Sequence, residues 1–149
     1  MTSTHNISLE LTSILEKAAD FHGHLGPFLV IGVRAGLFGL NRVGITKSDT
    51  LVVTASVPIR IPFSCILDGL QISTNCTVGN QRLSVRNSDE IQVTFERKGN
   101  RRKVVVALNR STFSKLKSQL LQESLSDREV RELAWKVASI PEDELFILT

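Results

Sequence analysis

The chain has 149 residues, 42% of them hydrophobic, which is enough to bury one complete core without disulfides or metals. Eighteen Lys and Arg against 15 Asp and Glu give a net charge of +3, but five of the basic residues lie within residues 97–103. Without them 13 basic residues face 15 acidic ones, so the composition does not indicate nucleic-acid binding. We interpret residues 97–103 as a solvated hairpin tip, and expect one domain over residues 8–149 with a disordered segment at residues 1–7.

The sequence shows no export signal and no membrane span. Its longest apolar segment, residues 25–40, is interrupted by Arg34 and three glycines and is too short to cross a bilayer. We therefore expect a cytoplasmic protein without a membrane partner. In that compartment the two cysteines, Cys65 and Cys76, are expected to be thiols or metal ligands rather than a disulfide.

Two helices are predicted near the N-terminus. From Ser8 to about Asp20 the apolar residues recur at i, i+3, i+4, i+7 and i+8, as in an amphipathic helix. A second helix is expected from Pro27 to about Leu40, because proline suits a first helical position, and its apolar composition indicates burial on most sides. Three glycines lie near one of its faces, and we expect another backbone to pack closely there.

Residues 51–57 alternate between apolar and polar side chains and predict a half-buried strand, after which we expect a helix to begin at Pro62. At 100° per residue, one face of that helix lies opposite the core stripe and carries Cys65, Asp68, Gly69 and Ile72. A thiol and a carboxylate therefore share a face that is not the main core face.

The second half of the chain predicts more strands and two closing helices. Three strands near residues 83–85, 91–95 and 103–109 are separated by turn-forming residues and predict an antiparallel meander. One closing helix is expected near residues 113–121, and Ser126 with Glu129 forms a capping box for the other. An apolar tail at residues 145–148 needs cover.

The residues with the most chemical potential are two histidines, two cysteines and a carboxylate: His22, His24, Cys65, Cys76 and Asp68. Zinc takes histidine nitrogen and cysteine sulfur, and an H-x-H turn can present both rings to one ion, although that motif alone is a weak signal. The cysteines lack C-x-x-C spacing, and either can instead be a small buried hydrophobic residue. Asp68 can orient a histidine, cap a helix or pair with an arginine.

Two motifs together resemble one known family. Phe21-His22-Gly23-His24-Leu25 with Pro27, followed by Cys65, Asp68, Gln71 and the segment 75–79, is similar to the FmdE family, named for an accessory component of formylmethanofuran dehydrogenase. The resemblance implies an α+β domain, helices packed on a mixed four-stranded sheet in the order α-α-β-α-β-β-β-α-α. It also implies a homodimer, an accessory role beside a redox enzyme of one-carbon metabolism, and a zinc-type metal held by His22, His24, Cys65 and Cys76.

This sequence departs from the family motif at a position that matters for metal binding. Gly26 stands where the family usually has cysteine, which removes a thiolate ligand. The C-terminal zinc ribbon of longer members also has no counterpart in this sequence. Two hypotheses follow: a metal-binding domain, in which Asp68 or His22 would carry protons if the domain is catalytic, or a metal-free binding or assembly module that keeps the fold.

Overall fold

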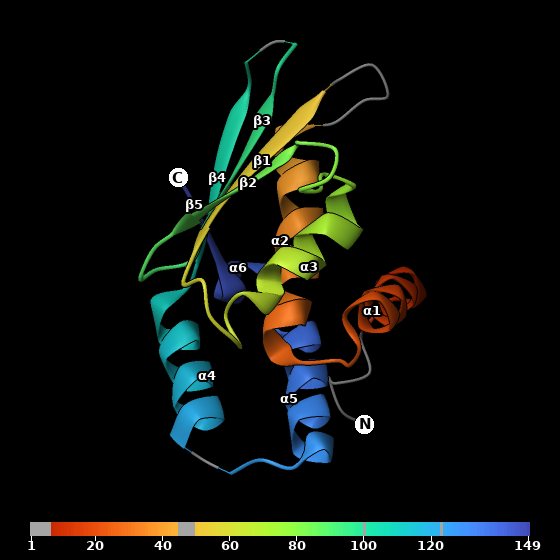
Figure 1. Cartoon of the computed structure of the whole chain (residues 1–149), viewed down its shortest axis with the longest axis vertical. Coiled ribbons are helices and arrows are strands. Elements are labelled where there is room, and N and C mark those ends of the chain that lie inside the picture. The colour runs from red at the N-terminus through yellow and green to blue at the C-terminus, as the bar shows by residue number, and fades with distance from the viewer. Residues whose placement is uncertain (1–6, 45–49, 100, 123) are drawn as a thin grey trace.

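The computed structural model describes residues 7–44, 50–99, 101–122 and 124–149. Helices pack on a mixed sheet, with α2 directly against the strands and α1, α3 and α5 around it (Figure 1). In chain order the elements are α1 (Leu9–His22), α2 (Pro27–Val43), β1 (Leu51–Val57), α3 (Cys65–Thr74), β2 (Leu83–Asn87), β3 (Gln92–Arg97), β4 (Lys103–Leu108), α4 (Arg110–Gln122), α5 (Asp127–Ser139), α6 (Glu142–Leu145) and β5 (Phe146–Leu148). The expected α+β class is confirmed.

The segment expected to be disordered, residues 1–7, lies outside the described residues except for Ile7, which packs against the core. Within the described ranges, no helix combines the length and hydrophobicity that a bilayer crossing requires.

The first two helices meet at a tight connection. Ser8 caps α1 by accepting the Leu11 N–H at 3.0 Å, and the helix continues to His22, past the expected end at Asp20. Gly23 ends it in the left-handed region at φ 111°, where a residue without Cβ is favoured. Gly26 then precedes Pro27, the first residue of α2, as expected for proline.

Glycines set the contact between α2 and α3, as the glycine spacing predicted. A Cβ at Gly32 would overlap the carbonyl oxygen of Ile66, and a Cβ at Gly36 would overlap the hydroxyl of Ser73. On the other helix, a Cβ at Gly69 would overlap the carbonyl oxygen of Leu29. The expectation that Gly69 lies away from the core is therefore wrong, because the two backbones touch there.

The start of α3 also differs from the prediction. Pro62 does not open the helix; it belongs to a preceding turn, and α3 begins at Cys65. The Cys65 N–H bonds to the Pro62 carbonyl at 3.1 Å and the Ile66 N–H bonds to the Phe63 carbonyl at 3.2 Å, a tighter i to i+3 pattern than that of an α-helix. Phe63 is buried and meets Phe28 edge to face, which anchors this turn.

The sheet has five strands in the order β2-β1-β3-β4-β5, one more than expected. The additional strand is the apolar C-terminal tail, which pairs antiparallel with β4. The β3–β4 hairpin is confirmed, but β2 is not part of a meander: it pairs in parallel with β1. A parallel pair needs a crossover, and α3 supplies it, so β1 occupies the place beside β3 that the meander assigned to β2.

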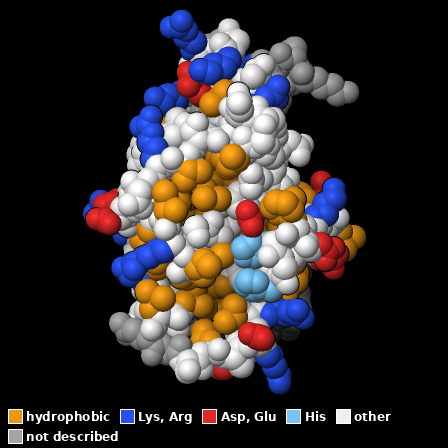
Figure 2. Space-filling view, in the orientation of Figure 1, with side chains coloured by type: hydrophobic (Ala, Val, Ile, Leu, Met, Phe, Trp, Pro, Cys, Tyr) orange, Lys and Arg blue, Asp and Glu red, His pale blue; other side chains and the backbone are white. Residues whose placement is uncertain are grey.

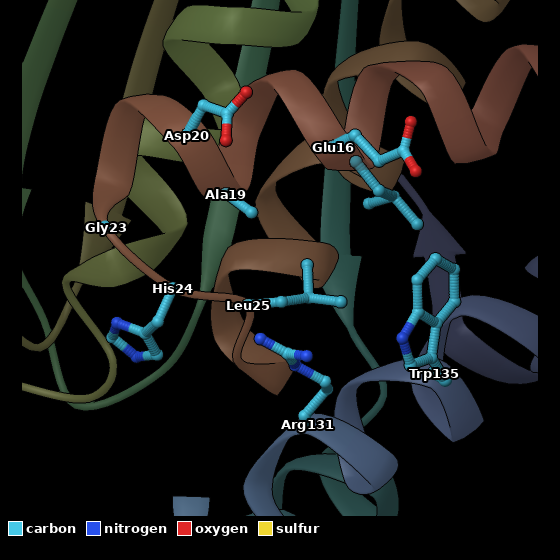
Figure 3. Close-up of a pocket in the computed structure, with 9 residues that line it drawn as sticks. Glu16, Ala19, Asp20, Gly23, His24, Leu25, Arg131 and Trp135 are labelled. Carbon is cyan, nitrogen blue, oxygen red and sulfur yellow. The ribbon is translucent and has the colours of Figure 1, made fainter. Parts of the chain in front are cut away.

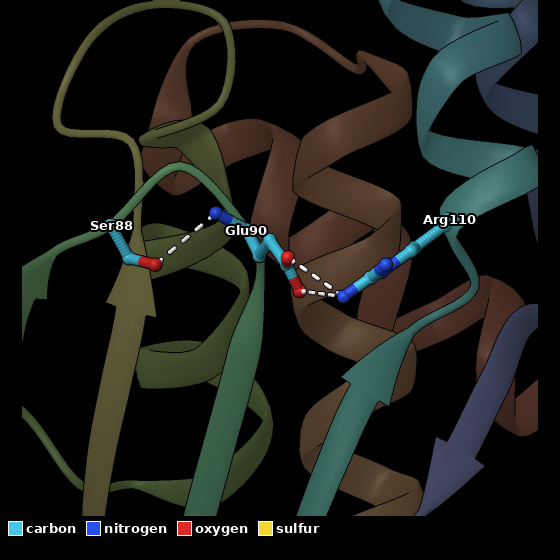
Figure 4. Close-up of polar contacts among 3 residues, drawn as sticks. All are labelled: Ser88, Glu90 and Arg110. Atoms are coloured by element: carbon cyan, nitrogen blue, oxygen red, sulfur yellow. Dashed lines mark hydrogen bonds and ion pairs between the residues drawn. The ribbon is translucent and has the colours of Figure 1, made fainter.

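Polar contacts attach the closing helices. The expected Ser126–Glu129 capping box is present at the start of α5. Arg34 on α2 donates to the carbonyls of Val137 and Ile140 at the end of α5, and burial lowers its pKa. At the start of α4, Arg110 binds both carboxylate oxygens of Glu90, at 3.1 and 2.9 Å, while Ser88 accepts the Glu90 N–H (Figure 4).

Candidate functional site

The two described histidines lie on either side of Gly23. His22 belongs to the last turn of α1 and its side chain is 14% exposed, whereas His24 is exposed in the connection to α2. Their ring centroids are 5.0 Å apart and the ring planes are tilted by 40°. Figure 2 shows the pair as a single patch of imidazole on one face of the molecule, with a carboxylate beside it. The H-x-H spacing thus produces two neighbouring rings.

Asp68 on α3 holds the first of these rings. Its Oδ2 lies 2.6 Å from Nδ1 of His22, the length of a short charge-assisted hydrogen bond. Its Oδ1 accepts a hydrogen bond from the Gln71 amide at 3.3 Å, and the Gln71 carbonyl oxygen accepts the Val78 N–H at 3.1 Å. With Nδ1 engaged by the carboxylate, Nε2 is the nitrogen of His22 that is left for a ligand.

Cys65, the first residue of α3, lies close to this carboxylate. Burial raises the pKa of its thiol, and the negative charge of Asp68 raises it further, against a smaller effect of a backbone hydrogen bond. The neutral thiol is therefore favoured, and it is a weak nucleophile. Cys65 is half-buried, so its sulfur can still be reached from solvent.

Cys76 lies in a different environment. It follows Asn75, the residue that ends α3 at φ 60°, and it is 2% exposed. Its thiol donates to the Leu51 carbonyl at 3.4 Å, at the start of β1, and burial raises its pKa. Across the described part of the chain, no three His, Cys, Asp or Glu side chains gather into a ready metal site. The structure brings together His22, His24 and Asp68, with Cys65 near the carboxylate and Cys76 in the core.

Position 26 belongs to the same cluster. Gly26 has an extended backbone, φ −130° and ψ 165°, which any residue can adopt. A Cβ added there would lie 3.6 Å from Nε2 of His24 and 3.9 Å from a methyl of Val130, both ordinary van der Waals distances. A cysteine would therefore fit at this position, and its side chain would start beside the second imidazole.

A cavity of about 310 Å³ opens on the other side of His24, and sequence reasoning missed it. Glu16 and Asp20 of α1 and Arg131 and Trp135 of α5 line it (Figure 3). The only signal in the sequence is the i, i+4 spacing within each pair, and nothing in the sequence indicates that α1 and α5 face each other. Gln71 was part of the motif, but its role as the link between Val78 and Asp68 is visible only in the structure.

Fold and site together define a small α+β domain with a histidine–carboxylate cluster where α1, α2 and α3 meet. The family model described as "FmdE, Molybdenum formylmethanofuran dehydrogenase operon" matches residues 21–147, and the chain belongs to this family. The structure also resembles that of an FmdE-like protein of the tungsten formylmethanofuran dehydrogenase type from Syntrophus aciditrophicus. The TM-score is 0.58 and the identity 25%, over 100% of this chain and 76% of that one. The expected family is thus confirmed.

A curated relative from Archaeoglobus fulgidus, described as a probable S-adenosyl-L-methionine-binding protein, is 29% identical over 156 residues. The match covers 93% of this chain but 43% of the relative, so the chain spans less than half the length of that protein.

Proposed function

We propose that the chain is a metal-binding domain of the FmdE family in which His22 and His24 are the main ligands of a zinc-type divalent ion. The observation that carries this proposal is the 2.6 Å contact between Asp68 and His22, beside a second imidazole with its ring centroid 5.0 Å away. Histidines that bind metals usually give their other ring N–H to a carboxylate or carbonyl, which fixes the tautomer and the ring orientation.

The donor set fits an open site rather than a closed one. Structural zinc sites have four protein ligands, whereas the two imidazoles supply two and Gly26 supplies none. Cys65 is the next donor, because it is half-buried beside Asp68, while Cys76 would have to leave the core to take part. The remaining positions would be filled by water, a small molecule or the partner in a homodimer. An ion bound there would act as a Lewis acid or would lower the pKa of a bound water.

The protein side chains have separate tasks in this proposal. Asp68 keeps a proton on Nδ1 of His22 and holds the ring, and Gln71 holds Asp68. If Cys65 joins the site it must lose its proton, which its raised pKa opposes until a metal is present. If the domain is catalytic, His22 or Asp68 would carry protons.

The alternative is a metal-free binding or assembly module in which the loss of cysteine at position 26 emptied the site. Two variants distinguish the hypotheses: Gly26→Cys adds a thiolate beside His24, and Gly26→Ala adds the Cβ alone. If the metal proposal holds, wild type binds zinc, His24→Ala loses that binding, Gly26→Cys binds at least about tenfold more tightly, and Gly26→Ala stays at the wild-type affinity. If wild type does not bind and Gly26→Cys does, the metal-free module is supported.

The assembly part of the proposal is a cytoplasmic homodimer that serves a redox enzyme of one-carbon metabolism. It is supported by the family description, which refers to a formylmethanofuran dehydrogenase operon, and by exposed apolar side chains such as Ile59 and Ile61. Light scattering after size exclusion tests the dimer, which should have twice the 16.5 kDa mass of the chain. A mass of one chain at micromolar concentration would exclude a stable dimer.

A further inference from the structure

The cavity between α1 and α5 has two walls of different chemistry. Glu16 and Asp20, one turn apart on α1, make one wall acidic (Figure 3). Arg131 and Trp135, one turn apart on α5, give the other wall a guanidinium and an indole. Leu25 lies between the walls and provides an apolar surface.

These charged groups are not used to hold the fold together. The side chains of Glu16, Asp20 and Arg131 make no hydrogen bond or ion pair with residues that the structure describes. Asp127, one turn before Arg131, lines an adjoining hollow of about 440 Å³ and does not pair with it either. Opposite charges that face one cavity without contact leave space for a ligand between them.

The indole is also without a cationic partner. The two cation–π contacts among the described residues use Phe38 and Phe63, so no Arg or Lys in those ranges covers the ring of Trp135. Figure 3 places Glu16 above the indole and Arg131 below Leu25, nearer His24. A carboxylate and an aromatic face on one side favour a cation, and the guanidinium favours a carboxylate.

We infer that this cavity binds a small zwitterion, with its cationic group between Glu16 and Trp135 and its carboxylate on Arg131. The volume of about 310 Å³ lies at the lower end of the range for ligand pockets, which suits a molecule of amino-acid size. The inference goes beyond the metal proposal, since none of these contacts requires an ion at His22 or His24.

A set of three matched probes tests the charge requirement. γ-Butyrobetaine carries a trimethylammonium group and a carboxylate; its carbon isostere has a tert-butyl group in place of trimethylammonium; n-butyltrimethylammonium keeps only the cation. Trp135 is the single tryptophan of a chain without tyrosine, so its fluorescence reports on the cavity directly. The zwitterion should change the emission saturably, with half-saturation about three- to fivefold below that of either analogue. Equal responses to all three probes, or none, would overturn the inference.

Substitutions then test which residue reads which charge. Arg131→Gln should remove the preference for the zwitterion over the cation, and Glu16→Gln should remove its preference over the carboxylate. The control is Glu132→Gln, an exposed acid on α5 that pairs with Arg128 outside the cavity, and it should leave both preferences unchanged. Retention of both preferences in the two cavity variants would contradict the assignment. Binding should persist in the presence of a metal chelator, so its failure and the failure of the metal proposal are separate results.

Discussion

Asp68→Asn tests the contact on which the site depends. Asparagine has the shape of aspartate, but one of its two oxygens is replaced by an NH₂ group. Asp68 uses one oxygen for His22 and the other for the Gln71 amide, so in the variant one of these contacts sets a donor against a donor. Gln71 cannot relieve this by turning over, because its carbonyl oxygen already accepts the Val78 N–H.

The magnitude follows from the exposure of the pair. A hydrogen bond to a charged group contributes about 1.5–3 kcal/mol, but Asp68 is 34% exposed and His22 14%, so solvent screening reduces this. We expect the free energy of unfolding to fall by about 1–2 kcal/mol, measured by urea denaturation, and zinc affinity to fall about 10- to 100-fold, measured by competition with a chromophoric chelator. The control is Asp89→Asn, an exposed carboxylate in the β2–β3 connection. Unchanged stability and unchanged zinc affinity in Asp68→Asn would refute the orienting role.

Gly32→Ala should lower the free energy of unfolding by about 1–3 kcal/mol in spite of a better helix propensity, because its Cβ would overlap the Ile66 carbonyl, while Gly26→Ala should be nearly neutral; equal stability of the two variants would argue against close backbone packing. Both cysteines should react with iodoacetamide at neutral pH more slowly than a free thiol, with half-buried Cys65 faster than Cys76, and mass spectrometry of the alkylated peptides would expose the opposite order. Hydrogen bonds from Ser126 lower the pKa of Glu129 below its ordinary value of 4.5, so its contribution to stability is present above that pH and is lost as pH falls through the native pKa. Wild type should therefore be more stable than Glu129→Gln at neutral pH, and thermal melts should show the difference shrinking below pH 4.5, whereas a constant difference would contradict this role.

The sequence predicted those parts of the fold that depend on local spacing. Apolar periodicity placed α1 and α2, glycine spacing predicted the close approach at Gly32, and Ser126 predicted the start of α5. It failed where a distant partner decides the outcome. The turn after β2 is typical of a hairpin, but β1 had already taken the place beside β3, and no local pattern encodes that competition.

The site was predictable in its residues but not in its arrangement. The motifs indicated His22, His24 and Asp68, but the 46 residues between His22 and Asp68 are bridged only through the packing of α1, α2 and α3. Spacing could not decide between a ligand and a core residue for Cys76, because it lies in a loop without periodicity. Its bond to the Leu51 carbonyl places its thiol in the core, and whether it binds metal stays a prediction.

Zinc-edge anomalous diffraction from crystals grown with zinc tests the central proposal most directly. We expect one anomalous peak about 2.1 Å from a ring nitrogen of both His22 and His24, with Asp68 still bonded to Nδ1 of His22. Cys65 would be the next protein donor to approach the ion. The absence of any peak at this pair, in crystals that contain zinc elsewhere, would contradict the proposed site.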